Sequence, residues 1–223
     1  MSAASGRALG VALLASLLAI PADAQDSSVP ATEPNEHAAA VTVKFVGGAI
    51  LALALHETGH LVFDGVFAAQ PRMEAIRFGP FPFFAVTHRS GMPPREEFAI
   101  SSAGFWMQEA TDEWFLTRRW CRDTAVGCSF RDDRTWLAKG MFAFNLLNSV
   151  GYALVAFAKA GPTERDTRGM ADAIGVDERA IGVVILAPAV LDAYRYFRPN
   201  SRVAVWMSRG VKIGSMLLVL RSR

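Results

Sequence analysis

Long apolar stretches alternate along the chain with short segments that carry most of the charged residues. Apolar runs of this length predict helices, and we expect five of them, over about 38–67, 96–116, 135–160, 178–197 and 203–220. The first, third and fourth are apolar enough to cross a bilayer. The second carries Glu109, Asp112 and Glu113, which predict that part of it lies at an interface or faces the protein interior. The pattern therefore predicts an all-α polytopic membrane protein with about four to five membrane helices.

A different pattern occupies residues 73–87, between the first two predicted helices. Apolar and polar residues alternate on either side of Gly79-Pro80, which predicts two short strands joined by a turn. The backbone groups of an edge strand are free, so this small β-hairpin is able to pair with an extended peptide. A loop that skirts the membrane with aromatic anchors is the alternative interpretation.

The N-terminal residues have the pattern of a processing signal. Residues 1–24 contain a basic residue, an apolar run over 8–20 and small residues at the end, which predicts a signal peptide. An uncleaved first span is the alternative. Residues 25–40 are rich in serine and proline and predict a flexible leader, so 41–223 forms the membrane-embedded domain. Export of the leader predicts residence in a bacterial inner membrane or an equivalent compartment.

The composition is typical of a membrane protein and gives no indication of nucleic-acid binding. Hydrophobic residues make up 52% of the chain, above the usual content of soluble domains, and the mean hydropathy is +0.23. The net charge is only +2, so we expect no nucleic-acid partner. Cys121 and Cys128 are the only cysteines, and they predict either a disulfide in an oxidising compartment or two unpaired thiols.

Candidate chemistry is concentrated in His56-Glu57-Thr58-Gly59-His60, which lies inside the first apolar run. Histidines four residues apart share one face of a helix, so both imidazoles are able to bind the same zinc ion. Glu57 then serves as the general base of a hydrolase. Charged groups at membrane depth are costly, which favours a functional role. Two buried histidines bonded to neighbouring carbonyls are the alternative.

Catalytic zinc sites usually have three protein ligands and one water, so a third ligand is required. We prefer Asp192, which follows an apolar run interrupted by Pro188 and needs a partner at that depth. An ion pair with Arg195 is the alternative for this residue. Asp166 is the alternative third ligand; otherwise it is a solvated carboxylate or the cap of a short helix.

Three further polar residues are candidates for supporting roles. Asp64 lies about 12 Å along the helix from His56, too far to share its metal ion, so we expect it to accept a hydrogen bond from the His60 ring. A carboxylate at the membrane interface is the alternative. Asn145 and Asn148 are able to bind the substrate or the developing oxyanion, or to join two helices.

Taken together, these features resemble the site-2 protease family of intramembrane zinc metalloproteases. The resemblance covers about residues 41–200 and rests on four features. These are the motif at 56–60, the Gly79-Pro80 hairpin, the small-residue segment 103–108, and Asn145-Leu146-Leu147 or the alternative of Pro188 with Leu191-Asp192. The chain departs from the family pattern at Phe105, where the family has proline, at Gln108, where it has asparagine, and at Ala193, where it has glycine.

The resemblance implies hydrolysis of a peptide bond within or near the bilayer, in a membrane protein or peptide substrate. Two other classes remain open from the sequence. A non-catalytic zinc-containing membrane protein would keep the metal without cleaving anything, and a transporter would use the histidines to relay protons or metal. A zinc hydrolase that acts on lipid is a further alternative.

Overall fold

The computed structural model describes residues 38–78, 81–118, 120 and 128–222. The elements in chain order are α2 (Ala38–Val66), β1 (Arg72–Phe78), β2 (Phe81–Thr87), α3 (Pro94–Thr117), α4 (Trp136–Ala158), α5 (Asp166–Ile174), α6 (Glu178–Phe197), α7 (Arg202–Leu217) and a final 3₁₀ turn, η1 (Leu218–Leu220). The predicted signal peptide lies outside the described residues. So does the predicted leader, except for residues 38–40, which are the first residues of α2.

The mostly helical architecture and the small hairpin agree with the sequence. Each of the five predicted helices is present, with ends shifted by at most a few residues, and α5 is an additional short helix. Four helices are long and apolar enough to cross a membrane, namely α2, α4, α6 and the segment Arg202–Leu220. They suggest an integral membrane protein. α3 is not among them, because charged residues near both of its ends leave no apolar stretch of sufficient length.

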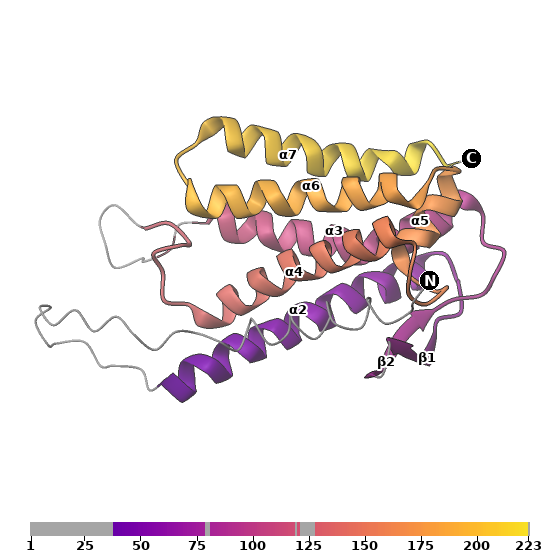
Figure 1. The fold of residues 1–223 in the computed structure, drawn as a ribbon, viewed down its shortest axis with the longest axis horizontal. Helices are drawn as coiled ribbons and strands as arrows, with labels where there is room; N and C mark the ends of the chain where they lie inside the picture. Colours follow the sequence, from indigo (N-terminus) through magenta and orange to yellow (C-terminus); the bar gives the residue numbers. More distant parts are fainter. Residues whose placement is uncertain (1–37, 79–80, 119, 121–127, 223) are drawn as a thin grey trace, which may run out of the picture. The chain divides into compact units, whose positions relative to one another are not determined.

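The helices of the described part pack in a chain of neighbours. α2 contacts α3 and α4, α4 contacts α6, and α6 contacts α7 (Figure 1). α2 and α4 approach closely at two glycines: a Cβ at Gly48 would collide with the carbonyl of Leu137, and a Cβ at Gly140 with the carbonyl of Phe45. Small residues at such a crossing let two backbones come together, which strengthens packing between apolar helices.

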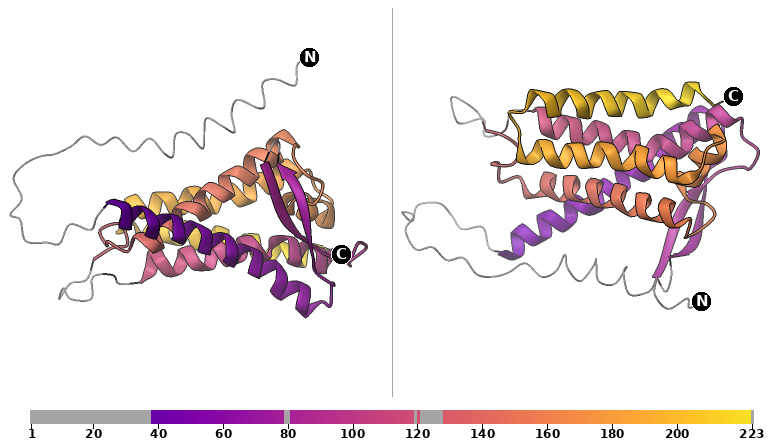
Figure 2. Two further views of the ribbon diagram at one scale, coloured as in Figure 1. Left: turned by 90° about the horizontal axis from the view of Figure 1, so that it is seen from below. Right: turned by 45° about the horizontal axis from the view of Figure 1, so that its top comes forward.

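The hairpin formed by β1 and β2 lies at the same end of the helices as α5 (Figures 1 and 2). Its strands are antiparallel, with Arg72 opposite Thr87 and Phe78 opposite Phe81. The predicted turn at Gly79-Pro80 is outside the described residues. The chain that leaves β2 is held to the end of α2, because the amide of Arg89 donates to the carbonyl of Ala69 over 2.9 Å.

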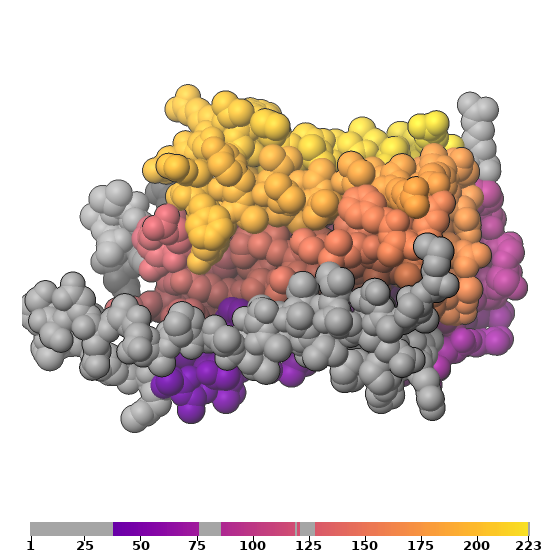
Figure 3. All heavy atoms as spheres, viewed as in Figure 1, coloured from indigo at the N-terminus to yellow at the C-terminus, as the bar shows by residue number. Residues whose placement is uncertain are grey.

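Many large apolar side chains point outward rather than into the core. On α2 they include Val43, Ile50 and Val62, and on α7 they include Trp206 and Ile213. The yellow surface of α7 beside the orange surface of α6 can be seen in Figure 3. Exposed apolar surface on this scale is unusual for a soluble monomer and suits helices in contact with lipid.

Candidate metal centre

Two buried imidazoles on α2 form the base of the candidate centre. His56 is 1% exposed and His60 is 4% exposed, and their Nε2 atoms lie 3.3 Å apart. The spacing of four residues places both rings on one helix face, as the sequence predicts. The two Nε2 atoms therefore converge on one point beside the helix.

Asp166, the first residue of α5, supplies a carboxylate at that point. Its Oδ2 lies 3.3 Å from His56 Nε2 and 3.5 Å from His60 Nε2. These three residues form the one group of histidine, cysteine or acidic side chains within the described ranges whose donor atoms are close enough to hold a metal ion. A tetrahedral zinc ion with bonds of about 2.0–2.1 Å keeps its ligand atoms about 3.3 Å apart. The donor set and its spacing therefore fit zinc.

The surroundings of Asp166 favour its ionised form. Burial by itself would raise the pKa of the carboxyl, but the charges of His60 and His56 and their hydrogen bonds outweigh burial and lower that pKa. Metal binding requires a deprotonated carboxylate. The carboxylate of Asp166 is therefore ionised while the imidazoles carry charge, and the imidazoles must lose their protons when they bind a metal ion.

Contacts from α3 and α4 fix the orientation of both rings. His60 Nδ1 donates to the carbonyl of Ile100 over 2.8 Å. The His56 ring lies over Gly104, where a Cβ would stand only 2.6 Å from Nδ1. Tyr152 stacks on His56 with ring centroids 6.0 Å apart and an interplanar angle of 30°. Hydrogen bonds and packing around ligand rings set their geometry and tune metal affinity.

Ile100, Gly104 and Tyr152 were not among the residues predicted for the site. Gly104 lies in the small-residue segment 103–108, on which the family resemblance partly rests. That segment could therefore have indicated Gly104 as a residue of the site. The carbonyl of Ile100 and the ring of Tyr152 carry no local signal, because only the packing of α3 and α4 against α2 brings them to the histidines.

Glu57 follows His56 on α2 and is half-buried. Its carboxylate takes part in no hydrogen bond with any residue that the structure describes. A general base must be free to take a proton from water within hydrogen-bond reach. The position of Glu57 beside the centre is compatible with that role.

Asp192 lies elsewhere, and the preference for it as third ligand is corrected. Its Oδ2 accepts from Lys212 Nζ over 2.7 Å, and its Oδ1 accepts from Ser208 Oγ over 2.6 Å. Arg195 Nη1 is 3.5 Å from Oδ1, so the predicted alternative of an ion pair with Arg195 is present. These partners from α6 and α7 satisfy the buried carboxylate, and the carboxylate near the histidines is that of Asp166.

Asp64 does not accept from His60, because the carbonyl of Ile100 takes the His60 Nδ1 proton. The Asp64 side chain is fully buried, and neither of its oxygens has a hydrogen-bond partner among the described residues. The Nδ1 atom of His88 lies 3.7 Å from Asp64 Oδ1. The expectation of a hydrogen bond between Asp64 and His60 is therefore wrong, and the charge nearest to Asp64 comes from the segment after β2.

The two asparagines of α4 contact α3. Asn145 Nδ2 donates to Asp112 Oδ1 over 2.7 Å, and Asn148 Nδ2 lies 3.5 Å from Gln108 Oε1. Contacts of this kind join helices in an apolar setting. They favour the predicted alternative of helix association over contact with a substrate.

The predicted disulfide involves Cys121, which lies outside the described residues. Cys128 is described, and its backbone pairs with that of Trp120 in an isolated antiparallel bridge. Cys128 is disulfide-bonded, in agreement with the predicted alternative of a disulfide over unpaired thiols.

Comparison with known proteins identified no relative of this chain. Scans of protein-family models, curated proteins and solved structures gave no match. The likeness to site-2 proteases therefore remains a resemblance carried by the residues themselves.

Proposed function

We propose that this protein is a zinc-dependent hydrolase of the membrane that cleaves peptide bonds in or near the bilayer, in the manner of a site-2 protease. One observation carries the proposal: Asp166 converges with His56 and His60 beside Glu57. Two imidazoles, one carboxylate and an adjacent glutamate are the residue types that catalytic zinc sites of metallopeptidases use.

Zinc, when bound, supplies a Lewis acid that activates water at neutral pH and polarises a scissile carbonyl. His56, His60 and Asp166 would hold the ion. Glu57 would take a proton from the attacking water and give it to the leaving amine, which general acid–base catalysis requires. Tyr152 and Gly104 would keep the His56 ring in place during this exchange.

A helical substrate hides its peptide bonds, so a segment of it must unwind before it can react. The hairpin of β1 and β2 consists of two strands, which leaves an outer edge on each for pairing with an extended peptide. The hairpin lies at the α5 end of the helices, and α5 carries Asp166 (Figure 2). This arrangement supports delivery of an unwound substrate from the hairpin toward the centre.

The test compares purified protein and its Glu57→Gln variant, both reconstituted in lipid vesicles with a library of synthetic transmembrane peptides. We expect Glu57→Gln to keep its zinc and to lose about 10²–10⁴-fold in cleavage rate, measured by mass spectrometry of the fragments. Glu96→Gln, a glutamate outside the centre, is the control and should cleave at the normal rate. Equal cleavage by Glu57→Gln and Glu96→Gln would reject the proposal.

The same vesicles separate a hydrolase from a transporter. A transporter would move zinc across the vesicle membrane, and a fluorescent zinc indicator inside the vesicles would report that flux. We expect peptide fragments and no zinc flux. We also propose the bacterial inner membrane as the location, which fractionation of membranes from cells that express the full chain would test.

A further inference from the structure

A groove separate from the metal centre lies between α2, α3 and α4. Its volume is about 800 Å³, within the range of pockets that bind small molecules. Most of its wall is apolar and comes from Leu55, Met107, Ala110, Leu137, Ala138 and Met141. None of His56, Glu57, His60 or Asp166 lines it. The groove is therefore not the place where the proposed hydrolysis occurs.

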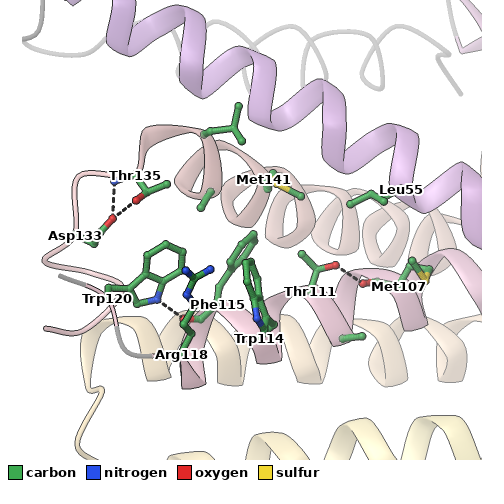
Figure 4. Close-up of a pocket in the computed structure, with 13 residues that line it drawn as sticks. Leu55, Met107, Thr111, Trp114, Phe115, Arg118, Trp120, Asp133, Thr135 and Met141 are labelled. Atoms are coloured by element: carbon green, nitrogen blue, oxygen red, sulfur yellow. Dashed lines mark hydrogen bonds between the residues drawn. The ribbon is translucent and has the colours of Figure 1, made fainter. Parts of the chain in front are cut away.

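The groove follows one face of α3. Met107, Thr111, Trp114 and Arg118 recur at helical spacing along it, and eleven residues of helix correspond to about 16 Å. Figure 4 shows Leu55 and Met107 at one end and Arg118 with Trp120 at the other. Trp114 and Leu137 are 52% and 41% exposed, so the groove opens to the surroundings of the helices. In a bilayer those surroundings are lipid.

A single arginine marks one end of the groove. The Arg118 guanidinium carbon lies 4.8 Å from the centre of the Trp114 ring and 5.1 Å from that of Trp120. No carboxylate of the described residues lies within ion-pair distance of Arg118. Arginine and tryptophan together are typical of the headgroup level of a bilayer. A guanidinium also matches the geometry of a phosphate group.

The middle of the groove offers little to a peptide backbone. The Thr111 hydroxyl already donates to the carbonyl of Met107 over 2.7 Å, and the neighbouring wall is apolar. An extended peptide would leave its amides unsatisfied there, which costs free energy. A hydrocarbon chain needs no such partners.

We propose that this groove binds one phospholipid, with an acyl chain along the apolar wall and the phosphate on Arg118. The proposal combines a long apolar groove that opens sideways, a cation at one end with no carboxylate partner among the described residues, and two neighbouring indole rings in contact with that cation. It does not depend on metal binding or hydrolysis.

Native mass spectrometry of detergent-solubilised full-length protein, titrated with phosphatidylglycerol, tests the proposal. We expect one phospholipid to bind with a dissociation constant about 10–100-fold lower for the unchanged protein than for Arg118→Gln, because a charge-assisted contact is lost. Arg131→Gln removes an exposed arginine outside the groove lining and should bind as the unchanged protein does. Equal affinities of Arg118→Gln and Arg131→Gln would overturn the proposal.

Two further arms identify which part of the lipid is recognised. Ala110→Leu fills the apolar wall and should weaken binding, while inorganic phosphate should fail to displace the lipid. If inorganic phosphate displaces the lipid, the acyl chain is not recognised and the proposal is overturned. If a transmembrane peptide displaces the lipid and a short-chain phospholipid does not, the groove binds peptide and the proposal is overturned. Arg118 is partly exposed and lies just after α3, so we expect Arg118→Gln to fold. This variant therefore tests the proposal even if Ala110→Leu does not fold.

Discussion

Asp166 Oδ2 lies 3.3 Å from His56 Nε2, although 110 residues separate the two in the chain. The contact depends on how α5 is held. Glu178, at the start of α6, accepts from Arg165 Nε and from Arg165 Nη2, each over 2.6 Å, and from Thr167 Oγ1 over 2.6 Å. Asp166 therefore sits between two residues that bond the same carboxylate, which positions the first turn of α5.

Replacement of Glu178 by alanine should loosen α5 and move Asp166 without touching the candidate ligands. We expect zinc affinity to fall about 10–100-fold, as for residues that orient metal ligands. The adjacent Asp177 pairs with Lys159 at the exposed surface, so Asp177→Asn is the matched control. Competition with a chelator of known affinity measures both variants. Equal affinity in the two would show that the Glu178 contacts do not position the centre.

Gly104→Ala should disturb the His56 ring directly. The new Cβ would stand 2.5 Å from His56 Nε2, a distance that forces the ring to move. We expect zinc affinity to fall at least about tenfold, in the range seen when ligand orientation is lost. Gly47→Ala, on α2, adds a methyl group to open space and should leave zinc binding unchanged. A Gly104→Ala protein with normal zinc affinity would contradict the contact between α3 and this ring.

The buried pair of Asp192 and Lys212 should matter for stability and not for metal. The two side chains are 1% and 5% exposed, and their charged atoms are 2.7 Å apart. Lys212→Met leaves a buried carboxylate without its main cation, which costs about 3–5 kcal/mol. Thermal unfolding in detergent should show this loss, with zinc content per folded protein unchanged. The double variant Lys212→Met/Asp192→Asn should be more stable than Lys212→Met, because the carboxylate is no longer charged. If the stability loss of the double variant equals the sum of the losses of the two single variants, the two residues do not interact directly.

His88 makes the attachment of the hairpin depend on pH. Its Nε2 lies 2.8 Å from Glu97 Oε2 and its Nδ1 lies 3.7 Å from Asp64 Oδ1. The hydrogen bond with Glu97 raises the pKa of His88 above its ordinary 6.5. Burial lowers this pKa and the charge of His60 lowers it further, whereas the charges of Glu97 and Asp64 raise it. Because the folded-state pKa is raised, the stabilisation is complete below pH 6.5 and is lost as pH rises through the folded-state pKa.

Hydrogen exchange of the backbone amides of β1 and of residues 86–89 measures this effect. We expect exchange, corrected for its intrinsic pH dependence, to become faster as pH rises above 6.5 in the unchanged protein. His88→Gln should remove that additional pH dependence. The same corrected profile in both proteins would mean that His88 does not hold the hairpin.

α2, α4, α6 and α7 were predictable from the sequence because each contains a long apolar run, and a run of that kind is a local property. α5 is only nine residues long and has no long apolar run, so the sequence indicated it only through the alternative that Asp166 caps a short helix. The sequence also predicted that His56 and His60 lie together, because residues four apart share one face of a helix. The catalytic role of Glu57 stays a prediction.

The third carboxylate was chosen wrongly for a physical reason. Asp192 is buried, as its apolar surroundings predict, and a buried carboxylate does need a partner. That partner is Lys212 on α7, which packs on α6 only in the folded protein. Asp166 looked like a solvated residue because the packing of α5 against α3 is a long-range contact with no counterpart in the local sequence.

The central claim is that one divalent cation is held by His56, His60 and Asp166. The most direct measurement is the zinc affinity of Asp166→Ala beside Asp172→Ala, which changes an exposed aspartate on the same helix. We predict that Asp166→Ala loses zinc affinity at least about tenfold while Asp172→Ala binds zinc as the unchanged protein does. Equal zinc affinity in the two variants would contradict the claim.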